Sequence, residues 1–166
     1  TSVTKTNKAI KNAQPNLDGY IFYNKIGSGA YASVWLAYSL THRTHCAIKM
    51  IHEHSHSRLH APLPPLIAKE VSAIQIGSGC RFIIDHITTV YQEGHYYIIL
   101  ELMRGGTLGS LPIPLPLIQA RYYIAELSIA LGHLHARGVS HSDLHLENVL
   151  LDSNGHVKLT DFGSAK

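Results

Sequence analysis

The chain is poor in charge, in cysteine and in long apolar runs. Of its 166 residues, 15% are charged and 45% are hydrophobic, and the mean hydropathy is +0.03. This much apolar material with so little charge is typical of a chain that folds around a core, which excludes a disordered protein. No run approaches the roughly 20 apolar residues of a membrane span, so a transmembrane segment is excluded as well.

The two cysteines, Cys46 and Cys80, are too few for a disulfide scaffold. They favour reduced thiols that lie in or near the core without a role of their own, and hence an intracellular protein. No secretion signal follows Thr1. The net charge of +3 is small, and no cluster of Lys and Arg favours nucleic acid. We therefore expect a cytoplasmic protein, with the nucleus left open.

The pattern of apolar residues divides the chain into three parts. Residues 1–16 are polar and are expected to form an extension. Residues 17–103 alternate like strands and contain one helical segment, whereas residues 104–166 are mainly helical. The expected strands are 20–26, 31–38, 46–51, 82–91, 95–102, 149–151 and 157–159; the expected helices are 66–74 and 115–137, the second ending at Gly138. This order predicts an α+β fold.

A glycine-rich turn, Gly27-Ser28-Gly29, joins the first two expected strands. Glycines without a Cβ atom let backbone amides approach a phosphate closely. A strand follows the turn, which disfavours a Rossmann site, and no Gly-Lys-Ser/Thr follows, which excludes a Walker A loop. Taken alone, the segment is better explained as an ordinary hairpin turn.

Three further segments carry residues suited to catalysis. Lys49 ends an apolar strand, where a charge needs a partner, and Glu70 on the next helix is the natural candidate. The loop after the long helix holds Asp143 and Asn148, and Asp161-Phe162-Gly163 follows the last hairpin. Each segment alone has an ordinary explanation, such as a surface lysine or an aspartate in a turn.

The order of these segments is more specific than any one of them. A glycine-rich hairpin, Ala47-Ile48-Lys49, Glu70, the loop 141–148 with its H-x-D-x-x-x-x-N pattern, and Asp161-Phe162-Gly163 together resemble the protein-kinase signature set. The sequence resembles eukaryotic Ser/Thr protein kinases over nearly all of residues 17–166. Residues 121–166 are most similar to the AGC group, and residues 161–166 to its phosphoinositide-dependent kinases.

The resemblance implies a kinase-like fold, with an antiparallel β N-lobe that carries one helix (17–103) and the beginning of a mainly helical C-lobe (104–166). It implies phosphoryl transfer from Mg-ATP to Ser/Thr hydroxyls of protein substrates. Asp143, Lys49 and Glu70 would be catalytic, with Asp143 accepting the proton of the hydroxyl and Lys49 holding the phosphates. Asn148 and Asp161 would bind Mg²⁺.

The resemblance also assigns a nucleotide site between the two lobes. Gly27 and Gly29 would cover the phosphates, and Leu100 would stand at the gatekeeper position. The backbone of Glu101 and Met103 would bind adenine. The apolar walls of the adenine pocket would be Ile26, Val34, Ala47 and Leu150. Lys49 and Glu147 would also bind the nucleotide.

The sequence departs from the family pattern at several positions. Ala32 stands where the family's glycine-rich loop has a third glycine. Ser142 stands where many kinases have an arginine that usually binds an activation-loop phosphate. His145 replaces a lysine that supports the transferred group, and histidine is only partly cationic near neutral pH. The sequence stops at Lys166, so we expect a fragment whose helix 115–137 exposes an apolar face that could bind a partner.

Two alternatives to an active kinase stay open at this point. The departures at Ser142 and His145 also suit a pseudokinase-like scaffold that binds nucleotide or a partner without catalysis. Clustered histidines can instead bind zinc, although a solvated loop explains them better; they are His52, His54, His56 and His60.

Overall fold

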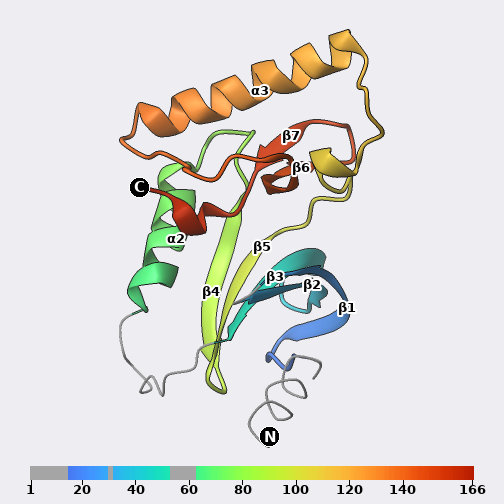
Figure 1. Ribbon diagram of the computed structural model, residues 1–166. Helices are drawn as coiled ribbons and strands as arrows, with labels where there is room; N and C mark the ends of the chain where they lie inside the picture. Colours follow the sequence, from blue (N-terminus) through green and yellow to red (C-terminus); the bar gives the residue numbers. More distant parts are fainter. Residues whose placement is uncertain (1–14, 30–31, 53–62) are drawn as a thin grey trace, which may run out of the picture.

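A computed structural model describes residues 15–29, 32–52 and 63–166 of the chain. The extension 1–14, residues 30–31 after the glycine-rich turn and most of the histidine-rich segment lie outside the described residues, so the structure does not address the predictions for them. A five-stranded sheet occupies one end of the molecule, and a small hairpin and a long helix occupy the other (Figure 1). The expected α+β arrangement is confirmed.

The larger sheet is antiparallel, with the strand order β1-β2-β3-β5-β4. Along β2, alternate side chains are buried, as expected where one face of a sheet covers a core. A turn at Glu93-Gly94 joins β4 to β5. The strand bounds are β1 Tyr20–Ser28, β2 Ala32–Ser39, β3 Thr44–His52, β4 His86–Gln92 and β5 His95–Glu101.

Helix α2 (Pro65–Ile76) lies against this sheet and begins at a proline. Proline suits the first helical position because the N–H group it lacks would have no partner inside the helix. Ile67, Glu70, Val71 and Ile74 are buried, a spacing of three and four residues that marks one helix face. Glu70 is therefore a charged residue on the buried face, which makes an ion-pair partner necessary.

Helix α3 (Leu117–His135) is shorter than the expected 115–137. It begins after Pro116 and ends at His135. Gly138, shortly after that end, has a φ of +75°, which agrees with its predicted role as a stop signal. Its buried face contains Tyr123, Glu126, Ala130 and Leu134. Ile118, Ile124 and Ile129 are 76%, 63% and 56% exposed, which confirms the expected apolar surface on this helix. Within the described residues, no helix is both long and apolar enough to cross a membrane.

The hairpin of β6 (Val149–Leu151) and β7 (Val157–Leu159) lies between α3 and the larger sheet (Figure 1). The buried carboxylate of Glu126 accepts a hydrogen bond from the Val157 N–H at 2.9 Å. On its other edge, β7 lies beside residues 82–84: the Leu159 N–H donates to the Phe82 carbonyl at 2.8 Å.

That pairing corrects the predicted strand 82–91. The segment 82–84 bonds with β7 rather than with β5, so β4 begins only at His86. The residues at positions 82–84 are apolar and buried, as they also would be if they paired with β5. The sequence pattern therefore could not distinguish pairing with β5 from pairing with β7. Three short 3₁₀ helices complete the described elements: η1 Leu108–Ser110, η2 Leu146–Asn148 and η3 Phe162–Ser164.

Cys46 lies on β3 with no exposed surface, and burial raises the pKa of its thiol to about 11. Because the thiolate is the reactive form, its population at pH 8 should be about two orders of magnitude below that of a thiol with a pKa of 9.0. We expect the folded Cys80→Ser variant to react very slowly with a disulfide reagent at pH 8 and to react fully in denaturant. Fast labelling of the folded variant would contradict this assignment.

Candidate active site

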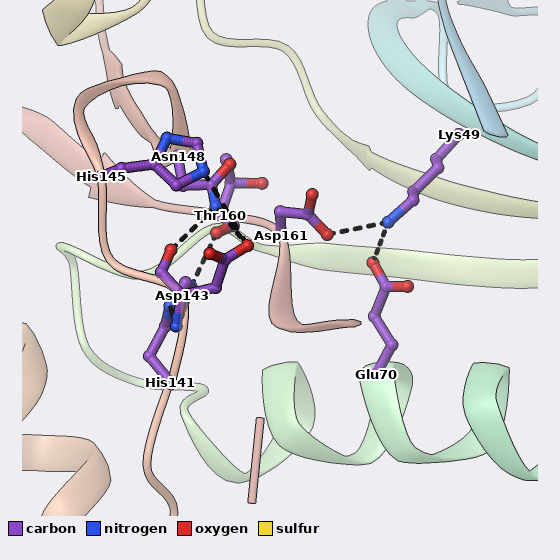
Figure 2. A network of polar contacts seen from close by, with 8 residues as sticks. All are labelled: Lys49, Glu70, His141, Asp143, His145, Asn148, Thr160 and Asp161. Carbon is purple, nitrogen blue, oxygen red and sulfur yellow. Dashed lines mark hydrogen bonds and ion pairs between the residues drawn. The ribbon is translucent and has the colours of Figure 1, made fainter. Parts of the chain in front are cut away.

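Lys49 on β3 connects the larger sheet to α2 and to the segment after β7. Its Nζ atom lies 2.6 Å from Glu70 Oε1 and 3.0 Å from Asp161 Oδ1 (Figure 2). The side chains of Lys49 and Glu70 are 17% and 7% exposed, whereas that of Asp161 is 48% exposed. The predicted partner of Lys49 is therefore present, and a second carboxylate joins the pair.

The charges in this network stabilise one another. Burial alone lowers the pKa of the Lys49 ammonium, but the carboxylates of Glu70 and Asp161 outweigh it and hold that pKa above its ordinary value. Burial alone raises the pKa of Asp161, but the Lys49 ammonium outweighs it and holds that pKa below its ordinary value. Lysine and aspartate are therefore both charged near neutral pH.

Asp161 has an unusual backbone conformation, with φ at +59° and ψ at 75°. A residue other than glycine is strained in this region, and such strain persists only where the surroundings fix it. Phe162 has no exposed surface, and its ring packs edge-on against His141 at 4.8 Å between centroids. The buried His141 ring in turn donates from Nε2 to the Thr160 carbonyl at 2.8 Å. These contacts hold the residues on both sides of Asp161.

Asp143 and Asn148 form a second group beside the first (Figure 2). Asn148 Nδ2 donates to the Asp143 carbonyl at 2.9 Å and approaches Asp143 Oδ2 at 3.4 Å. The Asn148 carbonyl accepts the Thr160 N–H at 2.9 Å, which ties this loop to the residue before Asp161. His145 Nε2 lies 3.8 Å from Asp143 Oδ2, so a protonated His145 would form an ion pair with Asp143.

The apolar residues predicted to surround adenine come from two parts of the fold. Ile26, Val34 and Ala47 lie on the neighbouring strands β1, β2 and β3, and Leu150 lies on β6. Ile26 is 49% exposed, and Leu150 is partly buried. Their arrangement around a nucleotide stays a prediction.

The first glycine of the glycine-rich turn lies close to a neighbouring side chain. A Cβ atom on Gly27 would lie 3.3 Å from the Val34 side chain, which is a tight contact. The Gly29 N–H donates to the Ala32 carbonyl at 2.9 Å. Ala32 thus contributes a backbone contact here, and its replacement of a third glycine leaves that contact in place.

The predicted adenine-binding backbone begins at the end of β5. The Glu101 N–H donates to the Asp85 carbonyl at 3.1 Å, and Met103 is partly buried against the core. Glu147, which the resemblance gave to the nucleotide, accepts a hydrogen bond from the Thr107 hydroxyl at 2.9 Å. Glu147 is thereby tied to the segment that follows Met103.

The sequence reasoning missed Lys158 and Asp85. Lys158 Nζ contacts the Glu101 carboxylate and lies 3.1 Å from Asp85 Oδ2, and its side chain is 15% exposed. The signal was available, because Lys158 stands between the apolar residues Val157 and Leu159 much as Lys49 follows Ala47 and Ile48. A lysine in an apolar strand again has carboxylate partners.

The residues present fit a nucleotide phosphate with a hard divalent cation. Such cations prefer oxygen ligands, and Asn148 and Asp161 supply amide and carboxylate oxygens. Asn148 uses its amide nitrogen on Asp143, which leaves Oδ1 as its ligating atom, and Asp161 uses Oδ1 on Lys49, which leaves Oδ2. Lys49 would supply a fixed positive charge for phosphate oxygens.

Comparison with known families identifies the class. The family model described as "Protein kinase domain" matches residues 20–166. With this match over most of the chain, and with the residues of the signature set placed as above, the chain belongs to the protein kinase family.

Several curated proteins are similar to it. Serine/threonine-protein kinase cek1 of Schizosaccharomyces pombe is 33% identical over 92% of this chain, and PKH2 of Saccharomyces cerevisiae, also named a serine/threonine-protein kinase, is 31% identical over 98%. Human ribosomal protein S6 kinase alpha-3 is 43% identical over 51% of the chain. The chain spans 11%, 15% and 12% of these relatives, respectively, so it matches only a small part of each.

The ion pair of Glu70 generates a prediction about stability. We expect Glu70→Ala to lower the free energy of unfolding by about 1.5–3 kcal/mol, because the buried lysine loses a charged hydrogen-bond partner. Denaturant unfolding measures the change. Glu93→Ala, at an exposed turn, is the matched control and should change stability by less than about 0.5 kcal/mol. Equal effects of the two variants would contradict a stabilising role for the pair.

Proposed function

We propose that this chain supplies the nucleotide site and catalytic loop of a serine/threonine protein kinase, which transfers the γ-phosphoryl group of Mg-ATP to protein hydroxyls. The observation that carries the proposal is the network in which Lys49 contacts both Glu70 and Asp161 while Asp143 and Asn148 lie beside it. The names of the relatives support the same activity.

Each residue of the network has a distinct task in this proposal. Lys49, held in place by Glu70, binds phosphate oxygens. Asn148 Oδ1 and Asp161 Oδ2 hold Mg²⁺, which when bound neutralises charge on the phosphates. Asp143 accepts the proton of the attacking hydroxyl, and its backbone is fixed by Asn148. The protein therefore contributes mainly positioning and electrostatic stabilisation, as phosphoryl transfer requires.

The adenine end of the site is proposed on the same basis. The backbone of Glu101 and Met103 forms hydrogen bonds with adenine, and Ile26, Val34, Ala47 and Leu150 provide apolar contacts. Gly27 and Gly29 cover the phosphates, and Glu147 is a further nucleotide-binding residue. A cytoplasmic location, protein substrates and the lack of a nucleic-acid partner stay predictions.

Replacing the proposed base tests catalysis directly. We expect Asp143→Asn to lower the rate of phosphoryl transfer by about 100- to 10,000-fold, because general base catalysis contributes about that much. Transfer from labelled ATP to a generic protein substrate measures the rate, and nucleotide affinity should stay within about threefold. Full activity of the variant would refute the assignment of Asp143 and favour a different base.

Replacing Lys49 separates an active kinase from a binding scaffold. Lys49→Met removes the charge that faces the phosphates, so we expect transfer to fall by about 100-fold or more. Lys69→Met, at the exposed position next to Glu70, is the matched control and should keep its activity. A wild-type protein that binds Mg-ATP but never transfers phosphate would support the scaffold alternative instead.

A further inference from the structure

Outside the proposed catalytic network, another dense group of charges joins β7 to the end of β5. It consists of Lys158, Glu101 and Asp85. Lys158 Nζ contacts Glu101 Oε1 and lies 3.1 Å from Asp85 Oδ2. The Lys158 side chain is 15% exposed and that of Glu101 is 29% exposed, so the pair is largely shielded from water. Nothing in the proposed chemistry uses this lysine.

Two further hydrogen bonds join Glu101 and Asp85, and both involve a backbone N–H group. The Glu101 N–H donates to the Asp85 carbonyl at 3.1 Å, and the Asp85 N–H donates to Glu101 Oε1 at 2.8 Å. These two bonds close a ring between the end of β5 and the residue that precedes β4. The same carboxylate oxygen, Oε1, also binds Lys158, so the ammonium fixes the side chain that closes the ring.

The ammonium stays charged under ordinary conditions. Burial alone lowers the pKa of Lys158, but hydrogen bonds and charges from Glu101 and Asp85 outweigh it and hold that pKa above its ordinary value. The Lys158–Glu101 pair is partly buried and is screened by water less than an exposed pair, whereas the Asp85 side chain is 62% exposed.

We propose that Lys158 is a positioning residue for nucleotide binding, which acts through Glu101 to fix the backbone that meets adenine. The inference rests on the proposed function, since that is what places adenine at Glu101 and Met103. Lys158 does not belong to the Lys49–Glu70–Asp161 network, so its effect is on recognition of the base and not on the phosphates.

Strand β7 connects Lys158 to the proposed metal ligand Asp161. It lies on β7 three residues before Asp161, and its strand pairs with β6, where Leu150 stands opposite it. One short strand thus carries the ion pair that anchors the adenine end and leads directly into the proposed metal ligand.

The test uses the natural, full-length protein and direct binding of two nucleotides. Inosine triphosphate carries a carbonyl oxygen in place of the 6-amino group of ATP, so it cannot donate from that position to a backbone acceptor. We expect Lys158→Met to weaken Mg-ATP binding about tenfold and to weaken Mg-inosine triphosphate binding much less. The preference for ATP should therefore fall, whereas kcat at saturating ATP should stay within about threefold.

Two variants and a control make the result specific. Lys158→Arg keeps the charge and should restore most of the preference for ATP. Glu101→Gln should give the same change as Lys158→Met, and the double variant should lose little more, because both act through one contact. Lys69→Met is the control and should bind both nucleotides like the wild type. Thermal unfolding confirms that each variant is folded.

The outcomes separate this inference from the proposed function. A folded Lys158→Met variant with unchanged affinities overturns the inference alone, as does an equal loss for both nucleotides or a rise in kcat. A wild-type protein that binds ATP without transferring phosphate overturns the proposed catalytic activity. The nucleotide-binding measurements still decide the role of Lys158 in that case. A wild-type protein that binds neither nucleotide overturns both proposals.

Discussion

The contact of one ammonium group with two carboxylates determines how the parts of this protein are arranged. Lys49 comes from the larger sheet, Glu70 from α2 and Asp161 from the segment after β7, and they meet within 3.0 Å of the lysine nitrogen. Each partner alone would be a costly charge in a partly buried place, and together they neutralise most of that cost. The contact thereby links the larger sheet, α2 and the segment after β7 at one point.

The loop 141–148 is held by a different kind of interaction. Hydrogen bonds from Asn148 and to Thr160, together with the packing of His141 on Phe162, hold Asp143 in place, and within the described residues Asp143 has no ion pair to lysine or arginine. Ser142, which stands where many kinases have arginine, has a φ of +63°, and its hydroxyl reaches only Ser140 among the described residues. Contacts among the described residues therefore hold the loop 141–148 in place.

The sequence predicted the fold correctly where its pattern of apolar and charged residues was compatible with only one arrangement of the chain. Alternation gave most strands within a few residues, and the lysine after Ala47 and Ile48 correctly required Glu70. Prediction was wrong where two solutions bury the same residues, as for 82–84, which pair with β7. For α3 the exposed apolar face was predicted, whereas the burial of Glu126, whose carboxylate accepts the Val157 N–H, was not. The left-handed backbone at Asp161 follows from contacts distant in sequence and left no local signal.

The hairpin strand β7 has a consequence for how the molecule unfolds. Its three residues are bonded to β6, to the segment 82–84 that leads into β4, and through Glu126 to α3. The sheet at one end and the helix at the other therefore share a common element, and breaking β7 removes partners from both. Amide protons in β7 should accordingly exchange with solvent only when the whole described part of the chain opens, and the two ends should melt as one cooperative unit.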